Sequence, residues 1–329
     1  MQATGAGTSG IDFVGEFVRR AKPRTNIAVC EICGFYWSVA FGVGLVVWNP
    51  CWLAVLYGFL CILSGIGGLA ALSHEAQHLA LLPNRKWNDL VGAWLLAYPV
   101  GSIFGVSRAV HLAHHKHLNS ELDPDRHFHL EEDKANPAQF FLYYLKLLLG
   151  GQLWVSFVLN GFLRAQRSQQ PQPAESAIIV PPRKYPEVLN LMITQAVVFS
   201  LFWLASGKWW YYLVLWVIPI LTIGICLGYL RGFADHARLA TDDLHRAGGR
   251  LISIPNPTLI DRLTLVGLNF QYHAEHHFFP HVPHYFLPKL HRLMQSDPHY
   301  REKYLLRKSY WGFILDYWQQ IRNGIKSPA

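Results

Sequence analysis

Charged residues are scarce in two long parts of this 329-residue chain, which has 15% charged and 51% hydrophobic residues overall. Glu31 is the only charge between residues 27 and 72, and Lys208 is the only one between residues 188 and 230. Together with a mean hydropathy of +0.16, this composition is atypical of a water-soluble enzyme. It indicates an integral membrane protein.

Cysteine is also scarce, and its positions exclude several kinds of site. The five cysteines are an odd number and lie within or beside the apolar runs, so we expect reduced thiols. The Cys30-x-x-Cys33 pair lacks a thioredoxin-like context, which argues against a redox motif. There is no C-x₂-C-x₂-C run and no haem-binding segment, so the sequence offers no site for an iron–sulfur cluster or a haem.

Four apolar runs are near the roughly 20 residues needed to span a bilayer. They pair as two helical hairpins, each with a short turn. The first hairpin is residues 27 to 48 and 51 to 72, and the second is residues 188 to 206 and 209 to 230. Basic residues precede the first run (Arg19, Arg20, Lys22, Arg24) and are abundant after residue 230. The positive-inside rule therefore predicts that both termini face the cytoplasm. The first 26 residues lack a signal-peptide layout.

Two further apolar stretches, residues 90 to 107 and 140 to 163, are interrupted by Pro99 and Lys146 respectively. We interpret both as interfacial or re-entrant helices. A polar, Pro-rich linker follows at residues 164 to 186. The expected fold is thus an all-α integral membrane protein with four transmembrane helices in two hairpins, interfacial helices and a cytoplasmic histidine-rich cap. Its expected parts are residues 1 to 26, 27 to 295 and 296 to 329.

Histidine is absent from residues 1 to 73 and from residues 130 to 235, and most of the 17 histidines gather near span ends. Three motifs, HEAQH, HLAHH and HAEHH, have i, i+3 or i, i+4 spacing, which places side chains on one helix face. Their histidines are His74 and His78, then His111, His114 and His115, and finally His273, His276 and His277.

An all-imidazole set suits iron, copper or zinc, and not magnesium or calcium. Structural zinc uses about four ligands, so eight histidines are too many for one ion and fit two. The motifs can meet only if they lie on one side of the membrane. The number of crossings between them must then be even, which is why residues 90 to 107 and 140 to 163 are not expected to cross.

These three motifs, with the paired hairpins, resemble the histidine boxes of the integral-membrane fatty acid desaturase and hydroxylase superfamily. The likeness extends from about residue 27 to about residue 295. The run NFQYHAEHHFFPHVPHYFLPKL resembles the third box of acyl-lipid and sphingolipid desaturases, and LNSELDPD resembles an Asp-Pro stretch that follows the second box in several members.

The resemblance implies two iron ions, O₂ as co-substrate and two electrons from another protein, and it implies that the eight box histidines are metal ligands. It also implies a ninth ligand, for which His236 is the candidate. Asn269 is a candidate for holding a metal-bound water. Carboxylates would orient the imidazole N–H groups, and the candidates are Glu75, Asp123, Asp125, Asp235 and Glu275. We take His117, His127, His129, His281 and His284 as nonligands.

The expected activity is insertion of a double bond into an acyl chain of a fatty acid or lipid. The main alternative is a hydroxylase or ketolase of a lipid or carotenoid on the same scaffold. HEAQH alone also matches the H-E-x-x-H motif of zinc proteases, but this leaves two boxes unexplained. A metal transporter would place its ligands near the bilayer midplane. The expected partners are the membrane, the acyl substrate and an electron donor, but no nucleic acid.

With a net charge of +8, the protein is expected to present a basic cytoplasmic face. This face could dock an acidic ferredoxin or a small haem protein. It could equally attract anionic lipid headgroups.

Overall fold

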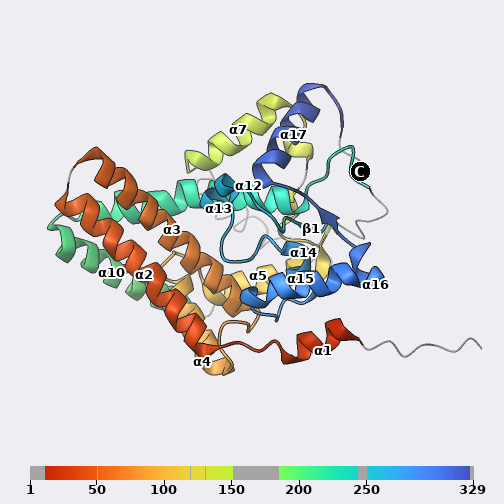
Figure 1. Cartoon of the computed structure of the whole chain (residues 1–329). Helices are drawn as coiled ribbons and strands as arrows, with labels where there is room; N and C mark the ends of the chain where they lie inside the picture. Colours follow the sequence, from red (N-terminus) through yellow and green to blue (C-terminus); the bar gives the residue numbers. More distant parts are fainter. Residues whose placement is uncertain are drawn as a thin grey trace, which may run out of the picture.

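The computed structural model describes residues 12–49, 51–118, 120–129, 131–150, 185–243 and 250–326, without the side chains of residues 127, 133 and 185. The described chain is helical except for two very short strands, as the all-α expectation requires (Figure 1). Four helices are long and apolar enough to cross a membrane: Thr25–Trp48, Trp52–Gln77, Pro186–Ser206 and Trp210–His236. The chain is a multi-pass integral membrane protein with the four expected spans. Residues 151 to 184, which include most of the predicted linker, lie outside the described residues.

The first hairpin consists of α2 (Thr25–Trp48) and α3 (Trp52–Gln77). Glycines let the two backbones approach closely, as is common between membrane helices. A Cβ atom added to Gly42 would lie 2.4 Å from the carbonyl oxygen of Gly58, and one added to Gly58 would lie 2.6 Å from that of Gly42. This contact anchors α3, whose far end carries His74 and His78.

The second hairpin consists of α10 (Tyr185–Ser206) and a span in four helical segments. These segments are α11 (Trp210–Tyr212), the π-helices η4 (Leu213–Val217) and η5 (Ile220–Gly224), and α12 (Ile225–His236). Gly207 makes the turn with φ +67°, a conformation that favours glycine. The hairpin returns the chain to the end of the bundle where α3 ends, with His236 as the last residue of α12.

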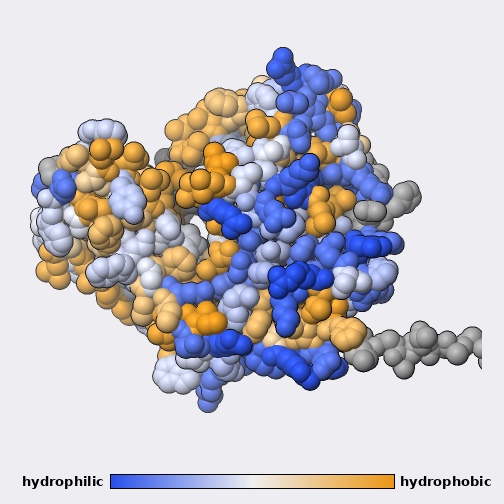
Figure 2. Space-filling model, viewed as in Figure 1, coloured by the Kyte–Doolittle hydropathy of each residue, from blue (hydrophilic) through white to orange (hydrophobic). Residues whose placement is uncertain are grey.

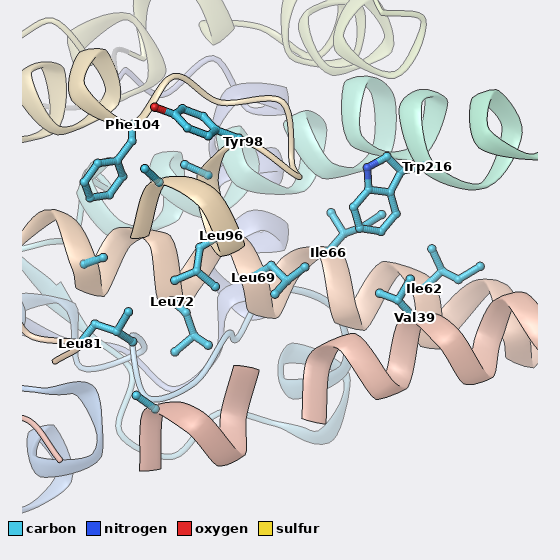
Figure 3. Close-up of a cluster of buried hydrophobic side chains, with 14 of the residues drawn as sticks. Val39, Ile62, Ile66, Leu69, Leu72, Leu81, Leu96, Tyr98, Phe104 and Trp216 are labelled. Atoms are coloured by element: carbon cyan, nitrogen blue, oxygen red, sulfur yellow. The ribbon is translucent and has the colours of Figure 1, made fainter. Parts of the chain in front are cut away.

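Residues 85 to 117 form a re-entrant pair of helices. The chain runs through α4 (Arg85–Val91) and the π-helix η1 (Gly92–Ala97), reverses, and returns as α5 (Phe104–His117). At the reversal, Gln195 Nε2 donates to the carbonyl oxygens of Tyr98 (2.5 Å) and Pro99 (2.9 Å), and Trp216 Nε1 donates to Pro99 O (2.9 Å). Figure 3 shows Trp216 beside Ile62 and Ile66 of α3.

Gln195 lies at the middle of the span Pro186–Ser206, so the turn that it holds is buried at membrane depth. Non-helical backbone is tolerated there when protein groups satisfy it. The segment enters and leaves on the same side, as the re-entrant interpretation of residues 90 to 107 requires. The re-entrant pair therefore brings the second histidine box to the side that holds the first.

A cap of short elements covers this end of the bundle, with hydrophilic residues over much of its surface and hydrophobic ones over the hairpins (Figure 2). Strand β1 (Ile252–Ser253) pairs in parallel with β2 (Leu305–Leu306). α7 (Pro137–Leu148) packs against α12 and α17 (Tyr310–Arg322) through contacts such as Phe140 with Phe233. The described half of residues 140 to 163 contains no candidate span. The helices of the cap are α1 (Phe13–Arg20), α6 (Arg126–His129), η2 (Glu132–Lys134), α7 (Pro137–Leu148), α13 (Leu259–Thr264), α14 (His273–Phe278), η6 (His284–Phe286), α15 (Leu287–Ser296), α16 (Pro298–Arg301) and α17 (Tyr310–Arg322).

Candidate metal centre

Five imidazoles from three helices meet where α3 ends. One ring nitrogen from each residue lies within 4.8 Å of those of the other four, and the set could hold a metal ion. The group, here called group 1, consists of His74, His78, His111, His115 and His276. His111 Nε2 lies 2.8 Å from His78 Nε2 and 3.0 Å from His115 Nε2.

A second set of imidazoles lies beside group 1 and centres on His236. His236 forms one three-residue cluster with His114 and His129 and another with His273 and His277, each with ring nitrogens within 4.8 Å. The Nε2 atoms of His236 and His273 are 2.9 Å apart. These five histidines are here called group 2. The two groups are in contact, because the rings of His115 and His277 stack with centroids 4.1 Å apart.

Both HxxHH boxes contribute to both groups, and helix geometry explains how. On a helix, residues i and i+4 point in nearly the same direction. Residue i+3 points to the other side of residue i from residue i+4. On α5, the i, i+4 pair His111 and His115 enters group 1, and His114 enters group 2. On α14 the assignment is reversed, because the i, i+4 pair enters group 2 and His276 enters group 1. The repeated spacing thus predicts two adjacent sites that share two helices.

The nitrogen spacing fits metal coordination. Ligands at 90° around an ion with metal–nitrogen distances of about 2.1 Å lie about 3.0 Å apart, close to the 2.8–3.0 Å between Nε2 atoms here. Buried ring nitrogens without a hydrogen-bond partner in the described part of the chain include both nitrogens of His276 and Nε2 of His277. Such nitrogens are costly to bury, and a bound ion would satisfy the one lone pair of each neutral ring.

Burial keeps most of these imidazoles neutral at physiological pH. Desolvation, together with the smaller effect of neighbouring imidazoles or cations, lowers the pKa of His78 to about 3 and that of His115 to about 2. Burial likewise lowers the pKa of His276 and of His277 well below the usual 6.5. A neutral imidazole has a lone pair available for a metal. The groups are therefore ready to bind without first losing protons.

Several ligand candidates are held by an acceptor at Nδ1, which is typical of metal-binding histidines. His114 Nδ1 lies 2.9 Å from Asp123 Oδ1, and both side chains are almost fully buried. His236 Nδ1 donates to the carbonyl oxygen of Arg250 at 2.8 Å. These acceptors fix the Nδ1–H tautomer, so each Nε2 has its lone pair toward the group.

Asp235 pairs weakly with a histidine from another box, since its Oδ2 is 3.6 Å from His273 Nδ1. The same carboxylate accepts a hydrogen bond from Tyr310 Oη at 2.9 Å. Tyr310 belongs to α17, so the C-terminal helix supports the site from outside the membrane spans.

The two glutamates proposed to orient imidazoles make other contacts. Glu75 accepts from the backbone N–H of His284 at 3.1 Å. Glu275 lies 2.5 Å from Ser253 Oγ and 2.5 Å from His291 Nδ1, behind α14. Both carboxylates therefore support the segment around the third box from the side away from the histidine groups.

Among the described residues, the side chain of Asn269 has no hydrogen bond to a histidine. Asp125 donates its backbone N–H to Asp123 Oδ1 at 2.9 Å, which supports the turn after the second box.

Of the histidines outside the boxes, His284 Nε2 lies 3.1 Å from Glu31 and His281 is exposed. The side chain of residue 127 is outside the described atoms. Among the described side chains, His129 alone of those set aside as nonligands lies within a cluster, and no spacing pattern in the sequence identified it.

The comparisons agree with this geometry. The model of the family described as fatty acid desaturase matches residues 26–309. The chain belongs to this family. Its membership accounts for the four spans and the three histidine boxes together, and it places the protein among oxidoreductases built on the membrane desaturase and hydroxylase scaffold.

Similar curated proteins include a dihydrorhizobitoxine desaturase of Bradyrhizobium elkanii, 26% identical over 247 residues. This match covers 71% of the present chain and 65% of the relative, slightly less than two thirds of its length. A β-carotene ketolase of Paracoccus sp. (strain N81106 / MBIC 01143) is 24% identical over 67% of the present chain and 72% of its own length. A β-carotene ketolase of Paracoccus sp. (strain PC1) is 22% identical, with 68% and 73% covered.

Proposed function

We propose that this desaturase-family protein is a di-iron, O₂-dependent enzyme that introduces a double bond into an acyl chain of a fatty acid or lipid. The observation that carries the proposal is the pair of adjoining groups of buried and partly buried imidazoles at the ends of α3, α5 and α12 and on α14. Two adjoining sites match the pair of ions required by the chemistry. The nine ligands proposed from the sequence divide between the two groups, with His74, His78, His111, His115 and His276 in group 1 and His114, His236, His273 and His277 in group 2.

Bound iron would supply the activation of O₂ that attack on an alkyl C–H bond requires. The overall reaction is balanced when a –CH₂–CH₂– unit, O₂, two electrons and two protons give –CH=CH– and two molecules of water. Neutral imidazoles leave the positive charge of the ions uncompensated. The carboxylate of Asp123 and the carbonyl of Arg250 hold the Nδ1 protons of their partner histidines and so keep Nε2 directed at the ions.

Apolar side chains close to group 1 support a hydrocarbon substrate. The ring of Phe270 lies 4.6 Å from that of His74 and 5.3 Å from that of His276, measured between centroids. Phe270 is almost fully buried. A methylene approaching from the membrane would therefore meet an apolar wall beside the donor atoms, and not bulk water.

Oxygen insertion is the second candidate activity, and the similarity to two β-carotene ketolases favours it. After the first hydrogen atom is removed, the substrate radical either loses a second hydrogen atom or gains oxygen. For hydroxylation, one C–H bond, O₂, two electrons and two protons give an alcohol and one water. A small shift in the position of the methylene decides between the two outcomes.

The two electrons would come from a separate ferredoxin or small haem protein. The cysteines lie in or beside the spans, and the sequence has neither an iron–sulfur nor a haem motif. The positive-inside pattern supports a cytoplasmic position for both termini and the metal centre. The net charge of +8 supports docking of an acidic electron-donor protein on the cytoplasmic side. Attraction of the same basic residues to anionic lipid headgroups is the alternative.

The test is to purify the protein in detergent after iron-supplemented expression and to measure the bound metals per chain. We expect about two irons, followed by O₂-dependent formation of a new double bond when lipid pools are supplied with a ferredoxin system. A new hydroxyl or keto group in place of the double bond would select the second candidate. One zinc and no iron would refute both and favour a zinc hydrolase or a transporter.

A further inference from the structure

Among the described residues, His129 joins His236 as a histidine outside the boxes that the structure places within group 2. It is the last residue of α6, a short helix that lies against α12 with the ring of Phe128 3.9 Å from that of Tyr229. The ring centroid of His129 is 4.1 Å from that of His236 and 5.2 Å from that of His114. A loop after the second box therefore returns a tenth imidazole to the metal centre.

The two ring nitrogens of His129 have different surroundings. Nδ1 lies 3.1 Å from the carbonyl oxygen of Gly232. A carbonyl only accepts hydrogen bonds, so Nδ1 carries the proton and Nε2 carries the lone pair. Nε2 is buried and has no hydrogen-bond partner among the described residues. If His129 only packed against α12, nothing would require a buried Nε2 without a hydrogen-bond partner beside two other imidazoles.

This arrangement repeats that of two proposed ligands of the same ion. His114 and His236 also place Nδ1 against an acceptor, Asp123 Oδ1 and Arg250 O respectively. The loop that supplies Asp123 to His114 continues directly into α6, so one segment fixes both an acceptor and the additional imidazole. A ring nitrogen from each of His114, His129 and His236 falls within one 4.8 Å cluster.

We infer that His129 is a further ligand of the second ion, so that five imidazoles surround each of the two ions. This rests on the proposed di-iron function. Group 1 already contains five histidines, and His129 raises group 2 to the same number. In six-coordinate geometry, five neutral nitrogen donors leave one position of each ion for O₂ or water. The loop after the second box thus completes the metal centre, in addition to connecting α5 to α7.

The test compares wild type, His129→Phe and His129→Gly after anaerobic loading with ⁵⁷Fe(II). Phenylalanine preserves a packed ring but has no nitrogen. The readouts are iron per chain during competition with a chelator and the Mössbauer spectrum. We expect one of the two ions in His129→Phe to be weakened more than the roughly 10- to 100-fold typical of an outer partner, and the other to stay bound with unchanged parameters. The retained ion also reports that the protein is folded, and exposed His281→Ala should behave as wild type.

Chemical rescue separates a ligand from a packing residue. Imidazole added to His129→Gly should enter the cavity and restore the affinity and spectrum of the second ion. Pyrrole has a similar ring but no basic lone pair, and should not. Two firmly bound ions with unchanged spectra in His129→Phe, or equal rescue by imidazole and pyrrole, would overturn the inference and leave the di-iron function intact. A wild-type protein without iron would overturn both.

Discussion

Replacement of Asp123 by asparagine should weaken one of the two ions selectively. Asp123 Oδ1 lies 2.9 Å from His114 Nδ1, and the exposed fractions of the two side chains are 1% and 4%. The same oxygen accepts from the backbone N–H of Asp125 at 2.9 Å. An asparagine oxygen can keep both hydrogen bonds, but it lacks the negative charge that makes the imidazole a better donor to a metal.

The size of the effect follows from this geometry. Loss of an outer partner of a metal-binding histidine costs about 10- to 100-fold in affinity. Asp123→Asn keeps a neutral hydrogen bond, so we expect the lower end, about tenfold or about 1.4 kcal/mol. Asp123→Ala leaves the buried Nδ1–H of His114 without its acceptor, which adds about 1–3 kcal/mol. The expected order of affinity is therefore wild type, then asparagine, then alanine.

The assay is anaerobic competition between the purified protein and a chelator for Fe(II), with helical content measured in parallel. Asp316→Asn is the matched control, because Asp316 is exposed on α17. Only the ion bound by His114 should be affected, so about one iron should resist the chelator as in wild type. If both Asp123 variants retain wild-type affinity for both ions, the carboxylate does not support the ligand and the reasoning fails.

Three further predictions concern ligands, the re-entrant turn and pH. His276→Ala should abolish turnover and lower iron content while the protein still inserts, whereas His281→Ala should keep most activity; equal behaviour of the two variants would contradict the assignment. Gln195→Leu removes donors to the turn and should destabilise the protein by about 1–2 kcal/mol, seen as a lower melting temperature in detergent; an unchanged value would count against the role of the turn. Because the pKa values of His78 and His115 in the folded chain are lowered to about 3 and about 2, the unfolded chain binds more protons below about pH 6.5. Metal-free protein should thus lose stability as pH falls from about 7 to about 5, by up to about 1.4 kcal/mol per pH unit for each histidine, and a pH-independent melt would refute this.

The spans and the meeting of the boxes could be predicted because both depend on local pattern. Long runs without charge identify membrane helices, and i, i+3, i+4 spacing identifies one helix face. The parity of crossings then required that residues 90 to 107 not cross the membrane, and the re-entrant turn held by Gln195 and Trp216 satisfies that requirement.

The partners of the histidines could not be predicted in the same way. Glu75 and Glu275 are adjacent in sequence to box histidines, but consecutive helix residues face directions about 100° apart. Their carboxylates therefore point away from the groups, to His284 and His291. The acceptor for His114 is Asp123, nine residues later in a loop. Asp123 is one of the five carboxylate candidates, but no spacing rule singles it out. The path of that loop, and hence the position of His129, follows from tertiary packing against α12, for which the sequence has no periodic signal.

The histidines of the two groups are far apart in the sequence, and this has a consequence for biosynthesis. Group 1 combines His74 near the start of the domain with His276 near its end, and group 2 likewise requires α14. A ribosome adding about 5–20 residues per second needs roughly 10–40 s to proceed from the first box to the third. Until then the nascent chain displays only histidine pairs and triplets, to which zinc binds more tightly than ferrous iron. Under the proposed di-iron function, a complete site for iron would therefore form only after both hairpins have been synthesised.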